Sequence, residues 1–203
     1  MHLSIRRHEG AAGRIEAIAD RLLGLIPTLR GQPGFEACYW LASEQGDVVS
    51  VRVFDDRQAA EMADEATREW TAAHLPDLLP QTPEVLAGEV AHQAVGTRTG
   101  LGQPFILIRV VEGITAPAQE VGPMVQQHSL VAIRSSPGLH AAYILRDERN
   151  RGRAATVTLF DTREHATGAH EKAVSVMRQR LAMVVPEPPK VMALGQIVLM
   201  AFA

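Results

Sequence analysis

The chain has 203 residues, of which 46% are hydrophobic and 21% charged, a composition typical of a globular protein that buries a sizeable core. Its formal net charge of −3 gives no indication of the basic surface with which nucleic-acid-binding proteins attract phosphate groups, so we do not expect nucleic acid as a partner. The single cysteine, Cys38, excludes an internal disulfide framework and a cysteine-rich zinc site, and we expect it to be a small buried hydrophobe.

The first half of the chain alternates between strand-like and helix-like patterns. Apolar and polar residues alternate over 3–8, as in a strand with one buried face, and apolar residues recur at helical spacing over 14–29. Pro27 lies inside the second pattern and should kink the helix or end it early. The further elements expected in this half are strands at 35–42 and 48–54, a helix at 57–75 and a strand at 85–95.

The second half repeats the first. Pro33-Gly34-Phe35 returns as Pro137-Gly138-Leu139, and Phe54-Asp55 returns as Phe160-Asp161, at offsets of 104 and 106 residues. Motifs that recur in the same order at nearly constant offset indicate an internal duplication. The elements expected in the second copy are a strand at 105–112, a helix from near 117 or 123 to 134, two strands around a turn at 147–152, a helix ending near 181 and a strand at 190–202.

Each copy contains a sequence typical of a helix start. Asp55 is followed three residues later by Gln58, and Asp161 by Glu164, which is the spacing of a capping box. We therefore expect Asp55 and Asp161 to cap the helices that follow them.

The element order β-α-β-β-α-β in each copy predicts the α+β fold class. We expect two tandem ferredoxin-like units, at 1–95 and 105–203, joined by a linker at 96–104. The helices of such a unit cover one face of its antiparallel sheet and leave the other bare. Because apolar burial is worth about 25 cal/mol per Å², the two units should pack sheet to sheet as an intramolecular dimeric α/β barrel.

These motifs resemble those of the dimeric α/β barrel superfamily, and within it the antibiotic-biosynthesis-monooxygenase-like group. The resemblance rests on Pro33-Gly34-Phe35, Phe54-Asp55 and Trp70, and with the second copy it covers almost all of the chain except the linker. It implies a pocket between sheet and helices that uses Trp70. The group includes cofactor-independent oxygenases of aromatic polyketides and haem-degrading enzymes. The expected first strand lacks the asparagine that haem degraders need, which makes haem degradation the least favoured of these activities.

Trp70 and His74 form the first candidate site. They lie four residues apart on the helix expected at 57–75, so both side chains can point into one pocket. The corresponding residues of the second copy are Val176 and Arg180, so only the first unit would keep such a site. The alternative is structural: Trp70 fills the core, and His74 stabilises the helix C-terminus.

Arg6 and Arg52 are the candidate cations. Arg6 and its counterpart Arg109 occupy equivalent strand positions, and a buried arginine must be paired or hold an anion. Glu9 and Glu112 recur beside them and are available partners, which favours structural pairing; a bound anionic substrate is the alternative.

No pattern in the chain predicts a cofactor or a metal site. The histidines lack the close spacing of a zinc-binding helix, and the linker glycines precede a strand, so they lack the helix N-terminus that binds phosphate. No apolar run reaches the roughly 18 residues of a membrane span, and the first residues lack the pattern of a signal peptide. We therefore expect a cytoplasmic protein that is a monomer with an internal pseudo-dimer, or a homodimer.

Two functions remain open at this stage. The first is a cofactor-independent oxygenase acting on a small aromatic or enolisable substrate, with His74 as base, Arg6 or Arg52 as cation and Trp70 as stacking wall. The second is a non-catalytic or stress-response barrel that binds a small hydrophobic or aromatic molecule. An open cavity at Trp70 and His74 would favour the first.

Overall fold

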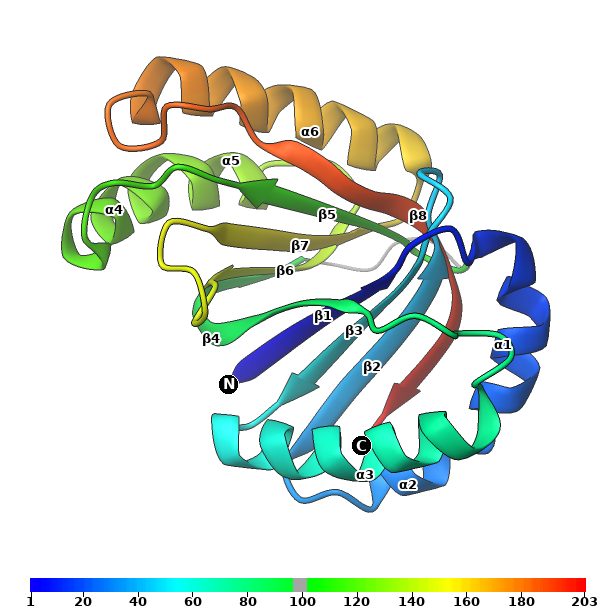
Figure 1. The fold of residues 1–203 in the computed structure, drawn as a ribbon. Helices are drawn as coiled ribbons and strands as arrows, with labels where there is room; N and C mark the ends of the chain where they lie inside the picture. The colour runs from blue at the N-terminus through cyan, green and yellow to red at the C-terminus, as the bar shows by residue number, and fades with distance from the viewer. Residues whose placement is uncertain (97–101) are drawn as a thin grey trace. The chain divides into compact units, whose positions relative to one another are not determined.

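The computed structural model describes residues 1–96 and 102–203 (Figure 1). The described chain divides into two compact units, one formed by residues 1–89 and 197–203 and the other by residues 90–196. These units do not coincide with the two repeats, because the last strand of each repeat begins in one unit and ends in the other. Of the expected linker at 96–104, residues 97–101 lie outside the described part of the chain.

The first unit has the elements that the alternating pattern predicts. They are β1 (His2–His8), a 3-10 turn (Ala12–Arg14), α1 (Ile15–Leu22), α2 (Ile26–Arg30), β2 (Phe35–Ala42), β3 (Val48–Phe54), α3 (Arg57–His74), the start of β4 (Glu84–Val95) and the end of β8 (Lys190–Phe202). The helix expected at 14–29 is divided in two, and Pro27 lies in the first turn of α2, where its missing N–H costs no hydrogen bond.

The sheet of the first unit is antiparallel, in the order β4-β1-β3-β2-β8. In its register Ser4 pairs with Arg52 and Arg6 pairs with Ser50, so these four residues share one face of the sheet. Helix α3 lies across this face, because Arg6 and Arg52 both reach α3 side chains. Apolar residues of α1, α2 and α3 complete a core against β2 and β3.

The second unit repeats this arrangement. Its elements are the end of β4, β5 (Phe105–Val111), α4 (Ala118–Met124), a π-helical turn (Val125–Ser129), α5 (Leu130–Arg134), β6 (Leu139–Arg146), β7 (Ala154–Phe160), α6 (Arg163–Val176), a second π-helical turn (Met177–Leu181) and the start of β8. The sheet is antiparallel, in the order β8-β5-β7-β6-β4. Helices α5 and α6 lie on the same side of this sheet (Figure 1).

The repeated motifs make the same turn in both units. Gly34 and Gly138 have φ angles of +68° and +66°, a conformation that glycine adopts without strain. Their carbonyl groups accept hydrogen bonds from the amides of Asp55 and Asp161. This contact corrects the expected capping boxes: the capping residues are Asp56 and Thr162, one position later, because the preceding residue still belongs to the turn.

Together the pairings run in the order β1-β3-β2-β8-β5-β7-β6-β4, and β4 pairs with β1, which is the strand order of a closed eight-stranded barrel. Each pairing lies within one of the two units. The prediction of an α+β chain with two tandem ferredoxin-like units is confirmed. Among residues 1–96 and 102–203 no helix is long and apolar enough to span a membrane.

Candidate functional site

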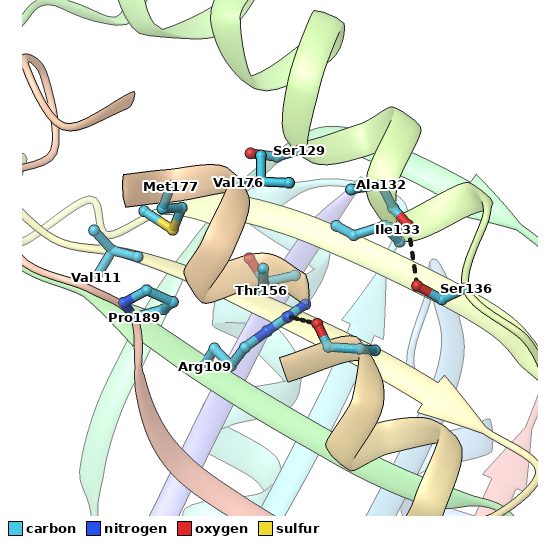
Figure 2. Close-up of a pocket in the computed structure, with 12 residues that line it drawn as sticks. Arg109, Val111, Ser129, Ala132, Ile133, Ser136, Thr156, Val176, Met177 and Pro189 are labelled. Atoms are coloured by element: carbon cyan, nitrogen blue, oxygen red, sulfur yellow. Dashed lines mark hydrogen bonds between the residues drawn. The ribbon is translucent and has the colours of Figure 1, made fainter. Parts of the chain in front are cut away.

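A cavity lies in the second unit between the sheet and its helices (Figure 2). Strands β5 and β7 form one wall, and α5 and α6 with their π-helical turns form the other. The cavity has a volume of about 40 Å³ and opens to solvent at its mouth. Its lining is mainly apolar and consists of Arg109, Val111, Ser129, Ala132, Ile133, Ser136, Thr156, Ala169, Ala173, Val176, Met177 and Pro189.

Arg109 is the charged residue of this lining. Strand alternation turns Leu107, Arg109 and Val111 toward the helices, whereas Ile108 and Val110 point to the opposite face. The side chain is 2% exposed, and its Nη1 donates a hydrogen bond to the carbonyl of Ala169, 3.1 Å away (Figure 2). Burial lowers the pKa of Arg109 to about 10, so the guanidinium stays charged at neutral pH.

No carboxylate lies within 4.0 Å of Arg109 among the residues that the structure describes. Glu112, the partner expected from the sequence, instead faces Arg153 at 3.6 Å and Lys190 at 3.8 Å. The expectation was wrong because a spacing of three residues places Glu112 on the opposite face of the strand from Arg109. A buried cation beside an apolar hollow favours binding of a negatively charged group.

His170 on α6 is a titratable group near this cation. It follows Ala169 directly, and its Nδ1 is buried without a hydrogen-bond partner. Burial, and secondarily the charge of Arg109, lower the pKa of His170 below its ordinary value, although Glu171 acts in the opposite direction. The imidazole is therefore neutral at pH 7 and able to accept a proton.

The hydroxyl groups of the lining come from three elements. Thr156 lies directly across from Arg109 in the β5–β7 ladder, and Ser129 and Ser136 belong to the helical wall. The hydroxyl of Ser136 donates to the carbonyl of Ala132 at 3.0 Å. The remaining groups are alkyl, so a bound molecule would meet one cation, a few hydroxyls and an apolar surface.

The equivalent place in the first unit is built from larger and more polar side chains. Asp64, Thr67 and Trp70 stand there at the positions of His170, Ala173 and Val176. Arg6 pairs with Asp64 at 2.5 Å, so the expected pairing of Arg6 with Glu9 is also corrected, for the same reason of strand face. The arginine of the first repeat has a carboxylate partner, whereas that of the second has none within the described part of the chain.

Arg52, the other candidate cation, lies beneath α3 and is 3% exposed. Its Nη1 donates to the Thr67 hydroxyl at 2.6 Å and lies 3.6 Å from Asp64. Its guanidinium carbon is 5.8 Å from the centre of the Trp40 ring. Burial lowers the pKa of Arg52. The structure thus brings Arg6 and Arg52 together around Asp64.

Trp70 and His74 also lie together, at the end of α3. Their rings stack with centroids 4.4 Å apart, and Nδ1 of His74 is 2.8 Å from the Trp70 carbonyl. His74 is exposed and Trp70 half-buried, and with Arg21, Gly24 and Ala73 they line a hollow that is open to solvent. The His74 ring thus contacts a carbonyl in the last turn of α3, as expected if His74 stabilises the C-terminus of this helix.

The sequence reasoning did not single out the second unit's cavity. A comparison of the two repeats could have indicated it. Ala173 and Val176 replace the larger Thr67 and Trp70 of the first repeat, while the arginine is kept as Arg109. The exchange of Asp64 for His170 removes the charge partner at the same time.

The fold defines the class first: the strand order is that of the dimeric α/β barrels, with both halves in one chain. No protein-family model matches the chain, and no curated protein matches it significantly. Solved structures share the fold. A Fusobacterium nucleatum protein provisionally named a monooxygenase matches with a TM-score of 0.77 at 12% identity, over 99% of this chain and 94% of its own.

Two further structures agree. A Lactobacillus acidophilus protein, also provisionally named a monooxygenase, has a TM-score of 0.71 at 10% identity, over 99% of this chain and 95% of its own. An anthrone oxidase-like protein has a TM-score of 0.63 at 15% identity, over 100% and 93% of the two chains. At these identities the similarity shows a shared fold, and it confirms the fold that the resemblance implied.

Proposed function

We propose that the chain is a cofactor-independent oxygenase acting on a small enolisable or phenolic substrate, and that its site is the cavity around Arg109. The observation that carries the proposal is a buried guanidinium with no carboxylate partner among the described residues, in a mainly apolar hollow. The neighbours in fold that are named as monooxygenases and as an anthrone oxidase-like protein support the same chemistry.

The groups present fit a reaction that begins with proton removal. His170, which adjoins the lining residue Ala169 but does not itself line the cavity, would take a proton from the carbon or hydroxyl of a substrate that reaches it. Arg109 would stabilise the resulting enolate or phenolate. This electrostatic stabilisation is strongest in a site that excludes water. The substrate anion then supplies the electrons that reduce dioxygen, so the protein needs to provide only a base, a cation and a dry cavity.

The size of the cavity limits the substrate. A cavity of about 40 Å³ has room for only a few atoms of a bound molecule. We therefore propose that the reacting group enters the cavity while the remainder of a larger substrate lies at its mouth. Acetylacetone and 2-hydroxyacetophenone are suitable first probes because both present an acidic enol or phenol on a small frame.

The test compares matched arginine variants. Oxygen consumption with each probe is measured for the wild type, Arg109→Gln, and the control Arg6→Gln, which changes the counterpart in the first unit. We expect Arg109→Gln to lower kcat by about 10²–10³-fold and Arg6→Gln to change it by less than about threefold. Equal losses in the two variants would exclude the second-unit cavity as the site.

The hollow at Trp70 and His74, with Arg6 and Arg52 as cations, is the competing site for the same chemistry. The variant His74→Ala separates the two, because His74 is exposed and its removal leaves the second unit unchanged. Turnover that is abolished in His74→Ala but kept in Arg109→Gln would assign the reaction to the first unit.

A non-catalytic small-molecule-binding barrel is the second candidate function. It is favoured by one observation, that His170 is not among the residues lining the cavity, which leaves the lining without a base. Native mass spectrometry of gently purified protein tests it. A retained organic molecule that stays chemically unchanged in oxygenated buffer would favour binding without catalysis.

A further inference from the structure

A cluster of buried polar atoms in the first unit is not used by the proposed function. Four side chains occupy a two-by-two patch on the α3-facing side of β1 and β3, because Ser4 pairs with Arg52 and Arg6 pairs with Ser50. Directly paired residues of antiparallel strands have Cβ atoms about 5 Å apart. The two serines and the two arginines therefore alternate within this patch.

Each of these four side chains has a buried atom without a partner. Among the residues that the structure describes, the Oγ atoms of Ser4 and Ser50 and the Nε atoms of Arg6 and Arg52 have no hydrogen-bond partner. Ser4 is 2% exposed, Ser50 is fully buried and Arg52 is 3% exposed. An unsatisfied buried polar group costs about 1–3 kcal/mol, so four of them on neighbouring residues of one patch point to a bound species that satisfies them.

The charges of the cluster favour an anion as that species. Arg6 and Arg52 carry two positive charges, and Asp64 supplies one negative charge from a side chain that is 35% exposed. Arg52, the more deeply buried cation, is 3.6 Å from that carboxylate, beyond hydrogen-bonding distance. His8 adds no charge at neutral pH, because burial and the two guanidiniums lower its pKa to about 4.

One group opposes an anion. The Oδ1 atom of Asp64 is buried and also lacks a hydrogen-bond partner. A carboxylate oxygen repels an anion, so the bound species must lie on the Ser4 and Ser50 side of the two guanidiniums. Thr67 closes the α3 side, where its hydroxyl accepts from Arg52 and donates to the Ala63 carbonyl. This enclosure favours a single-atom anion over a carboxylate or phosphate.

We propose that the first unit binds a chloride-sized anion through Ser4, Arg6, Ser50 and Arg52. The counterparts of these residues in the second unit are Leu107, Arg109, Thr156 and Thr158. That set has one guanidinium, and the Thr158 hydroxyl is already bonded to the Leu107 carbonyl. The halide site therefore belongs to the first unit alone, and it is independent of the proposed oxygenase activity.

The test measures the melting temperature of the full chain in sodium chloride and in sodium gluconate at equal ionic strength. For a dissociation constant near 20 mM, 200 mM chloride should raise the Tm by roughly 3–5 °C. The variant Ser4→Ala/Ser50→Ala should lose most of this rise. The control Thr156→Ala, at the position of Ser50 in the second unit, should keep it.

Two outcomes would overturn the proposal. One is an equal Tm in chloride and gluconate, which would mean that water satisfies the cluster. The other is an equal chloride response in the wild type and the double serine variant, which would place the ion elsewhere. The serine variants suit this test because they remove unsatisfied hydroxyls and leave both guanidiniums in place, so the chain should fold. Bromide-soaked crystals give a direct check, with an anomalous peak expected between Arg6 and Arg52.

Discussion

The guanidinium of Arg109 lies 3.1 Å from the main-chain carbonyl of Ala169, whereas its counterpart Arg6 lies 2.5 Å from the carboxylate of Asp64. The two repeats thus keep the arginine and change the group opposite it. A carbonyl dipole leaves the positive charge of Arg109 largely uncompensated, but Asp64 neutralises Arg6. This difference separates an arginine whose charge no carboxylate among the described residues balances from one that is paired with Asp64.

The first prediction concerns the stability cost of Arg109. Because its charge is buried and no described carboxylate pairs with it, Arg109→Met should leave the free energy of unfolding unchanged or raise it by about 1 kcal/mol. The control Arg52→Met removes a hydrogen bond from Thr67 and an interaction with Asp64, and should lower stability by about 1–3 kcal/mol. Urea denaturation measures both. A loss of more than 2 kcal/mol for Arg109→Met would show that Arg109 has a structural role.

The second prediction tests the cavity by filling it. Ala173 lines the cavity, and its counterpart in the first unit is Thr67. Ala173→Leu should raise KM for the enolisable probes by about tenfold, since the added side chain occupies the space a ligand needs, while the added apolar contacts keep stability within about 1 kcal/mol. The control Ala182→Leu adds the same volume at an exposed position. An unchanged KM in Ala173→Leu would exclude the cavity as the binding site.

The third prediction is a pH dependence from His8. Burial and the charges of Arg6 and Arg52 lower its pKa to about 4, against about 6.5 in an unfolded chain. Between these pH values His8 is therefore protonated in the unfolded state and neutral in the folded state. Stability from this group is complete above pH 6.5 and falls by roughly 2–3 kcal/mol as the pH decreases to 4.

The measurement for His8 is the free energy of unfolding from urea titrations between pH 4 and pH 7.5. The variant His8→Gln has no titrating group at this position, so its curve should be flatter than that of the wild type by the same amount. Parallel curves for the two proteins would contradict a lowered pKa of His8.

The fourth prediction concerns the only cysteine of the sequence. Cys38 is 1% exposed, and burial raises the pKa of its thiol to about 11. Because the thiolate is the reactive form, Cys38 should not react with Ellman's reagent in the native protein at pH 8 over an hour, and should react fully in 8 M urea. Rapid reaction of the native protein would show that β2 opens readily.

The sequence by itself determined the architecture. Periodicity located the strands and helices. The recurrence of Pro33-Gly34 as Pro137-Gly138 identified two copies of one unit, because this turn has a positive φ angle that favours glycine in both copies. Burial of Cys38 also follows from local pattern. These features depend on interactions between residues close in the chain, or on a sheet whose faces alternate strictly.

Only the tertiary structure decided where a ligand could bind. Arg6 pairs with Asp64, and Arg109 has no carboxylate partner in residues 1–96 and 102–203; both facts depend on which helix crosses which strand face. The cavity depends on small differences in side-chain volume, such as Ala173 in place of Thr67, summed over elements distant in sequence. The sequence predicted Trp70 and His74 as a site because their spacing of four residues lies within one helix. The buried charge of Arg109 and the cavity beside it arise from packing between elements distant in sequence, so no local pattern predicts them.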